Sequence, residues 1–152
     1  MREFVVPEAN TRHIKAPLKL EYAFQLRAKY DPPRESPTPK GTFRYQDITS
    51  GELVGDKLKG SIYPDSGGQY DTVRGDKIRD VDAHFMLKAE NGEFIYIEHV
   101  GYRRPDGYYR AIGYIEAKTD GAYDWVNNST FVVTAKESPD QREVVFTYYV
   151  AN

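Results

Sequence analysis

Two histidines and one aspartate flank a tight turn, and their side chains suit proton transfer. The turn contains Asn91-Gly92, a pair typical of two-residue β-hairpin loops, between two segments of alternating polarity. A two-residue loop places His84 opposite His99, with Asp82 on the same face of the sheet. Because histidine titrates near neutrality and burial raises the pKa of a carboxyl group, we expect Asp82, His84 and His99 to act as acids or bases.

The length of this loop decides which side chains meet. A three-residue loop with a bulge would shift the pairing by one residue and place Glu98, instead of His99, opposite His84. Alternation also leaves open which face of the hairpin looks inward. The opposite face is the more apolar one, so a solvated Asp/His/His face is the structural alternative to a catalytic one.

Further candidate site residues come from alternating segments elsewhere in the chain. Glu116 is a second candidate base. The competing interpretation is that Glu116 is a surface carboxylate with no catalytic role. Trp125 would supply a stacking wall, unless it only fills the core, and Asn127 an amide that orients a carbonyl group. We expect Tyr114 and Met86 to complete the substrate-binding side.

Alternation is also the main signal for the fold, and helical periodicity is almost absent. It predicts strands over 18–28, 41–49, 52–63, 69–74, 79–89, 93–103, 108–117, 122–134 and 142–151. So many strands with open edges would invite aggregation. We therefore predict an all-β chain that forms a single antiparallel closed β-barrel of about 8–10 strands, calycin-like, with an internal cavity. A β-sandwich is the competing architecture.

Length and proline content set the domain organisation. The 152 residues suffice for one domain, which we place at 17–152, after an N-terminal arm at 1–16. Four of the nine residues in 31–39 are prolines, so we expect that segment to be a loop in extended or polyproline form.

Composition and missing motifs exclude several classes of function. The formal net charge is −2, which argues against nucleic acid or a membrane as a partner. The chain contains no cysteine and begins without the apolar run of a secretory signal, so we expect a cytoplasmic protein. No glycine-rich phosphate cradle and no alternation of strands with helices occurs, so no cofactor is expected.

Short motifs in a fixed order run along residues 18–150. They are Thr38-Pro39-Lys40-Gly41, Ile48-Thr49-Ser50-Gly51, Gly55-Asp56-Lys57-Leu58-Lys59-Gly60, Gly67-Gly68, Val81-Asp82-Ala83-His84-Phe85, Asn91-Gly92-Glu93-Phe94-Ile95-Tyr96, Gly101, Ile115-Glu116 and Tyr123-Asp124-Trp125-Val126-Asn127. With this ordered set the sequence resembles the domain-of-unknown-function 3237 family of small β-barrel proteins. The resemblance implies a single barrel with polar residues around its cavity, and no firmly established activity.

The resemblance also bears on the hairpin. The family's polar motif falls on Asp82, His84, His99 and Gly101, which favours the inward orientation of that face. The chain departs from the family pattern at His84, where Arg is usual, and at His99, where Asn is frequent. It also has Gln69-Tyr70-Asp71 after the glycine pair, where an Asp-Trp pair is usual.

Three functional hypotheses follow. The first is a metal-free acid/base enzyme of isomerase, cyclase or lyase type, acting on a small hydrophobic organic ligand in the barrel. The second is a carrier that binds such a ligand unchanged. The third is a metalloprotein in which Asp82, His84 and His99 hold one ion, although the family departures count against it. A second copy of the chain is a candidate partner.

Overall fold

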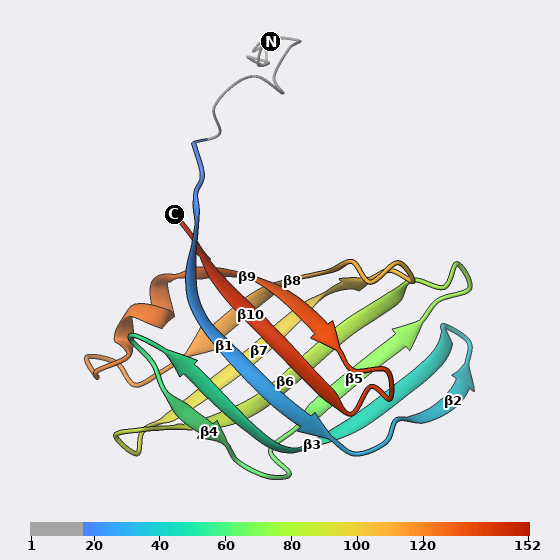
Figure 1. Ribbon diagram of the computed structural model, residues 1–152, viewed down its shortest axis with the longest axis horizontal. Helices are drawn as coiled ribbons and strands as arrows, with labels where there is room; N and C mark the ends of the chain where they lie inside the picture. The colour runs from blue at the N-terminus through green and yellow to red at the C-terminus, as the bar shows by residue number, and fades with distance from the viewer. Residues whose placement is uncertain (1–16) are drawn as a thin grey trace.

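The protein folds into ten strands and one short 3-10 helix in the computed structural model, which describes residues 17–152. The predicted N-terminal arm at 1–16 lies outside the described residues. The strands, labelled in Figure 1, are β1 (Leu20–Tyr30), β2 (Arg34–Thr38), β3 (Gly41–Gly55), β4 (Gly60–Ile62), β5 (Gly68–Val73), β6 (Arg79–Ala89), β7 (Phe94–Arg103), β8 (Tyr109–Glu116), β9 (Thr130–Glu137) and β10 (Glu143–Ala151). The helix η2 (Asp124–Asn128) lies between β8 and β9. Among residues 17–152 no helix is long and apolar enough to cross a membrane.

The strands form a closed antiparallel β-barrel of eight strands, as the alternation predicts. The sheet runs from β1 through β10, β9, β8, β7 and β6 to β3, and β3 then pairs with β1 to close the ring. The short strands β4 and β5 share one place in the ring, because each pairs with both β3 and β6. Strand β2 pairs with β3 alone and lies outside the ring.

Three segments differ from their predicted structure. The predicted strands at 41–49 and 52–63 are replaced by one continuous strand, β3, followed after a break by the short strand β4. Residues 34–38 of the proline-rich segment form the edge strand β2 rather than a loop, and Pro37 is tolerated because an edge strand does not need every N–H. The predicted strand at 122–134 begins with the helix η2, and only its second half is the strand β9. Trp125 and Asn127 therefore lie on a helix and not on one face of a strand, as two residues of an alternating segment would.

The β6–β7 turn has three residues, not two. Ala89 pairs with Glu93, and the Ala89 N–H donates to the Glu93 carbonyl oxygen at 2.9 Å. Gly92 occupies the left-handed region with a φ of 91°, and the Asn91 side chain accepts a hydrogen bond from the Glu93 N–H at 3.0 Å. This is the bulged alternative, and it places His84 opposite Glu98.

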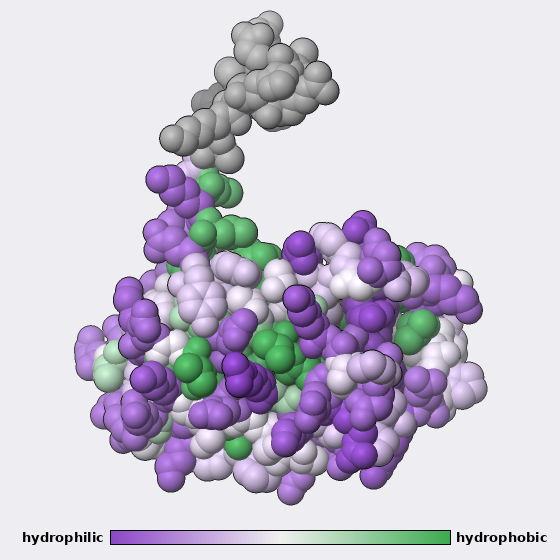
Figure 2. All heavy atoms as spheres, in the orientation of Figure 1, coloured by the Kyte–Doolittle hydropathy of each residue, from purple (hydrophilic) through white to green (hydrophobic). Residues whose placement is uncertain are grey.

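The barrel interior is packed with aromatic and aliphatic side chains over most of its length. Phe24, Phe85, Phe131 and Phe146 are fully buried and come from four different strands. Figure 2 shows that the outer face over β1 and β10 is mostly hydrophilic, with small separate apolar patches. The alternation of the strands thus sorts apolar residues into the interior, as a closed barrel requires.

Close approach of β7 and β8 gives a test of this packing. A Cβ atom on Gly101 would lie 2.0 Å from the carbonyl oxygen of Arg110, so the backbone would have to move. We expect Gly101→Ala to lower the free energy of unfolding by roughly 3 kcal/mol or more in urea denaturation. Gly75→Ala is the control, because nothing lies within 4 Å of its Cβ position. Equal stability of the two variants would contradict this register.

Candidate active site

The sequence-predicted residues separate into two groups because of the three-residue turn. Asp82, His84 and Met86 lie on the outer face of β6, and Tyr114 and Glu116 lie on the outer face of β8. His99 faces the interior and is fully buried. The prediction that Asp82, His84 and His99 share one interior face is therefore wrong, because a shift of one residue turns every side chain of β7 over.

The outer residues belong to a row that crosses five strands. His84 lies opposite Glu98, Glu98 lies opposite Tyr114, and the ring of Tyr70 stacks on His84 at 4.7 Å between centroids. Tyr45 continues the row on β3, with its ring centroid 5.2 Å from that of Tyr70. Within residues 17–152 no group of three His, Asp or Glu residues is placed to hold a metal ion. The metal hypothesis on Asp82, His84 and His99 is therefore wrong.

Trp125 and Asn127 lie on η2, the short helix between β8 and β9. The Trp125 ring packs against the core at Phe131, with 6.1 Å between ring centroids. Asn127 is exposed and fixes the helix to the end of β8, because its side chain exchanges two hydrogen bonds with the backbone of Ala117, at 2.8 and 3.1 Å. Both residues have structural contacts here, and neither lies near His99 or Asp82.

His99 sits in the middle of the barrel between two tyrosines. Its ring nitrogens lie 3.1 Å from the hydroxyl oxygens of Tyr148 and Tyr109, so both nitrogens are hydrogen-bonded. Burial lowers the pKa of His99 to about 3 and keeps the ring neutral at pH 7. A neutral, fully bonded imidazole is unsuited to proton transfer but well suited to holding two strands in place.

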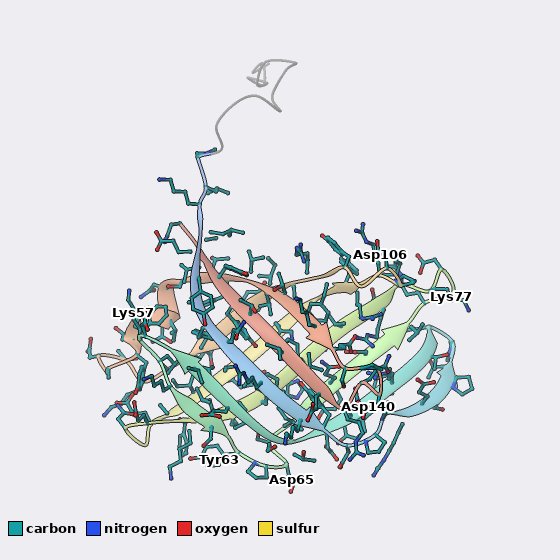
Figure 3. The ribbon with its side chains drawn as sticks, viewed as in Figure 1. Lys57, Tyr63, Asp65, Lys77, Asp106 and Asp140 are labelled. Carbon is teal, nitrogen blue, oxygen red and sulfur yellow. The ribbon has the colours of Figure 1, made fainter. Side chains whose placement is uncertain are left out.

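One end of the interior is polar rather than apolar. This polar end lies near the turns that carry Lys77, Asp106 and Asp140, labelled in Figure 3. Its side chains are buried or nearly so and come from five strands, and they are Tyr30, Arg44, Gln46, Gln69, Asp71, Arg79 and Glu137. Buried charged groups of this kind are rare without a functional or structural pairing.

Asp71 is held at the polar end by a break in the β5–β6 ladder. The strands pair at Gln69 with Ala83 and again at Thr72 with Asp80, but not between. Within that gap the Asp82 N–H donates to Asp71 Oδ1 at 3.1 Å, so the carboxyl group replaces a backbone acceptor. Burial raises the pKa of Asp71 to about 6, against the opposing effect of Arg79.

Three arginines lie around two carboxyl groups at the polar end, those of Asp71 and Glu137. Arg79 donates twice to Glu137, at 2.7 and 2.6 Å, and Arg103 also pairs with Glu137. Arg79 Nε lies 3.3 Å from Asp71 Oδ2, and Arg44 Nη1 lies 3.7 Å from the same oxygen. Burial lowers the pKa of Arg44 from its usual value, with Arg79 as the next cause. The polar end therefore concentrates guanidinium groups around one ionisable carboxyl.

Many polar atoms at this end lack a hydrogen-bond partner. Of the eight such buried side-chain atoms in residues 17–152, seven belong to the polar end. They are Tyr30 Oη, Arg44 Nη1, Gln46 Oε1, Gln69 Nε2 and Oε1, Asp71 Oδ2 and Arg79 Nε. Because an unpaired buried polar atom is costly, this concentration indicates a place that water or a polar ligand occupies.

None of these residues was among the predicted site residues, although the sequence contains a signal for them. Arg44 and Gln46 alternate on one strand, and Gln69 and Asp71 alternate on another, in phase with buried neighbours. Polar residues at the inward phase of a strand indicate a functional interior. By contrast, a surface groove of about 790 Å³ beside β4 is lined by Glu52, Lys59 and Lys88 among others, and these three residues are exposed.

A closed antiparallel barrel with an ionisable carboxyl group among guanidinium groups at one end defines a small β-barrel protein with a partly polar interior. The chain belongs to the family described as a protein of unknown function, DUF3237, whose model matches residues 18–151. This confirms the resemblance that the ordered motifs indicate.

The relatives agree with this fold. The UPF0311 protein RPA1785 from Rhodopseudomonas palustris is 25% identical over 87 residues, which cover 57% of this chain and only 56% of that relative. Its crystal structure superposes with a TM-score of 0.82 at 20% identity, covering 91% of this chain and all of that one. A β-barrel-like protein from Acinetobacter baumannii gives a TM-score of 0.81 at 22% identity, with 92% and 99% covered.

A further structure is described as an enzyme from Penicillium herquei. Its TM-score is 0.74 at 19% identity, with 91% of this chain and 97% of that chain covered. At these identities the likeness shows the shared barrel fold.

The burial of His99 predicts an acid-sensitive fold. In the unfolded chain His99 gains a proton below about pH 6.5, whereas the folded protein resists protonation down to about pH 3, so acid favours unfolding. Relative to the wild type, His99→Gln should gain stability on the order of 5 kcal/mol as the pH falls from 6.5 to 3. Urea denaturation at several pH values measures it. His84→Gln, on the outer face, should keep the wild-type slope; an equal gain there would contradict the assignment.

Proposed function

We propose that this protein is an acid/base enzyme that moves a proton on a small organic molecule, in a reaction of isomerase or lyase type. The observation that carries the proposal is Asp71, an interior carboxyl group whose pKa is raised to about 6 and which faces Arg44 and Arg79. A carboxyl group with such a pKa can both accept and return a proton near neutrality.

The two oxygens of Asp71 have different surroundings, which suits this role. Oδ1 accepts a hydrogen bond from the Asp82 N–H, while Oδ2 has no hydrogen-bond partner within residues 17–152 and lies 3.3 Å from Arg79 Nε and 3.7 Å from Arg44 Nη1. The carboxylate would remove a proton from a carbon next to a carbonyl group, and the C–H electron pair would move to form an enolate. Arg44 and Arg79 would stabilise the negative oxygen.

The enolate can then react in two ways that conserve atoms and charge. Return of the proton from Asp71 to a different carbon gives an isomer. Departure of a leaving group from the adjacent carbon, with Asp71 or water supplying its proton, gives an elimination product. Both need only the groups of the polar end, and neither needs His99 or the outer-face residues as a base.

The interior next to the polar end suits an apolar substrate body. Tyr109, Phe146 and Tyr148 are buried there around His99, with ring centroids 4.7 to 6.2 Å from the imidazole. A small hydrophobic molecule with one carbonyl oxygen would place its polar group at the arginines and its apolar body toward these rings. The description of the Penicillium herquei structure as an enzyme supports catalysis on this fold.

Hydrogen exchange at carbon tests the proposal without knowledge of the natural substrate. The protein is incubated in D2O with a set of small ketones and keto acids, and loss of C–H signals is followed by proton NMR. We expect the wild type to accelerate exchange, with a rate that rises through about pH 6 because Asp71 must be deprotonated. Asp71→Asn should lower that rate roughly 100-fold or more.

Two further variants separate this proposal from its alternatives. Asp80→Asn, on the neighbouring strand β6, is the matched control and should leave the rate within about twofold. Loss of exchange in Asp82→Asn or His84→Gln, with full activity in Asp71→Asn, would overturn the proposal in favour of the outer face. A wild type that binds a small molecule but accelerates no exchange would be a carrier, and the enzymatic proposal would fail.

A further inference from the structure

The turn between β9 and β10 closes the polar end of the barrel. It is a compact unit, because Ser138 N–H donates to the Glu143 carbonyl at 2.8 Å and Gln141 N–H donates to the Ser138 carbonyl at 2.9 Å. Asp140 adds two bonds within the turn, from the Ser138 hydroxyl at 2.6 Å and from the Arg142 N–H at 3.1 Å. A turn stabilised by its own bonds can move as one body.

Gln141 connects this turn to the buried polar residues. Arg44 Nη2 donates to Gln141 Oε1 at 2.5 Å, and Gln46 Nε2 donates to the Gln141 carbonyl oxygen at 2.8 Å. The turn is also joined to β1 by a bond from the Tyr30 N–H to the Arg142 carbonyl, at 2.8 Å. Gln141 thus makes the hydrogen bonds that join the turn to Arg44 and Gln46.

Local turn chemistry gives no reason for glutamine at this position. Gln141 has a φ of 61°, in the left-handed region that side chains other than Gly, Asn and Asp rarely adopt. The corresponding residues of the β6–β7 and β7–β8 turns are Gly92 and Gly107. Lys77 of the β5–β6 turn also has a positive φ, but its side chain is exposed, whereas that of Gln141 reaches Arg44. The contact with Arg44 therefore distinguishes this turn.

Arg44 is a buried cation with an incomplete set of partners. Its side chain is only 2% exposed, and among residues 17–152 the one hydrogen bond of that side chain goes to the neutral amide of Gln141. Asp71 and Glu35 approach it only to 3.7 and 3.9 Å, and Nη1 has no hydrogen-bond partner. A carboxylate has the planar shape of the Gln141 amide and a second acceptor oxygen, so it would engage both Nη1 and Nη2.

We propose that Gln141 occupies the place of a substrate carboxylate, and that the β9–β10 turn swings outward when a small carboxylic acid binds to Arg44. The proposal rests on the proposed function, since it names the substrate class for the same site. A surface pocket of about 270 Å³ lies against the turn, lined by Lys29, Tyr30, Thr49, Asp140, Arg142 and Glu143. Gln141 lies between two lining residues of this pocket, so withdrawal of the turn would connect it to the polar end.

Binding measured by NMR tests the inference on the full-length chain. Benzoate and pyruvate are titrated into isotope-labelled protein, with benzamide and benzyl alcohol as neutral probes. We expect the carboxylates to shift the signals of Gln46, Gln69 and residues 138–142, and the neutral probes to leave them unchanged. Gln141→Ala should bind the carboxylates about tenfold more tightly, because an internal competitor for the guanidinium is removed.

Gln141→Glu keeps the length of the side chain and supplies a carboxylate within the chain. It should weaken carboxylate binding about tenfold or more, and it avoids removing the buried Arg44. Lys77→Ala is the matched control for a positive-φ turn residue and should bind as the wild type does. Equal binding of neutral probes, or unchanged affinity in both Gln141 variants, would overturn the inference. If the carboxylates bind as expected but the protein accelerates no hydrogen exchange, the inference about Gln141 is supported and the proposed function is wrong.

Discussion

Closure of the sheet between β1 and β3 is the constraint on which the other features depend. On an open sheet, the inward residues of these strands would face water. In the closed ring, Arg44, Asp71 and Arg79 face the same interior, and desolvation raises the pKa of Asp71 to about 6 while Arg79 opposes the rise. The pairing that completes the fold therefore also creates the unusual carboxyl group.

Alternation of polarity was sufficient to predict an antiparallel closed barrel, because period-two patterns and the scarcity of helical ones leave few other architectures. The candidate site was less predictable, because it depended on the length of one loop. A third residue in the β6–β7 turn moved His99 to the interior and left Asp82 and His84 outside. Sequence preference for Asn-Gly does not separate the two turn types when Gly also suits the bulged one. The catalytic roles predicted for the outer residues stay predictions.

Asp71 shows which information a single sequence lacks. The alternation of Gln69 and Asp71 places two polar side chains on one face of a strand, but only the three-dimensional ring brings Asp71 next to Arg44 and Arg79. Trp125 and Asn127 illustrate the opposite case. They occur in a polar, aromatic segment typical of a binding surface, but one packs on Phe131 and the other bonds the backbone of Ala117. The residue types of Trp125 and Asn127 suggested a role in binding, whereas their contacts fix the helix η2 to the barrel.

The strand β2 has a consequence for how molecules of this protein meet one another. It is the outermost strand on its side of β3, and all five of its residues are exposed. An exposed edge strand without prolines has unpaired backbone N–H and C=O groups that can pair with a strand of another molecule, so barrels could associate edge to edge. Pro37 has no N–H to donate, and the chain continues through Pro39 directly afterwards. The proline-rich segment therefore disfavours the addition of a further strand at this edge, and with it the edge-to-edge association of barrels.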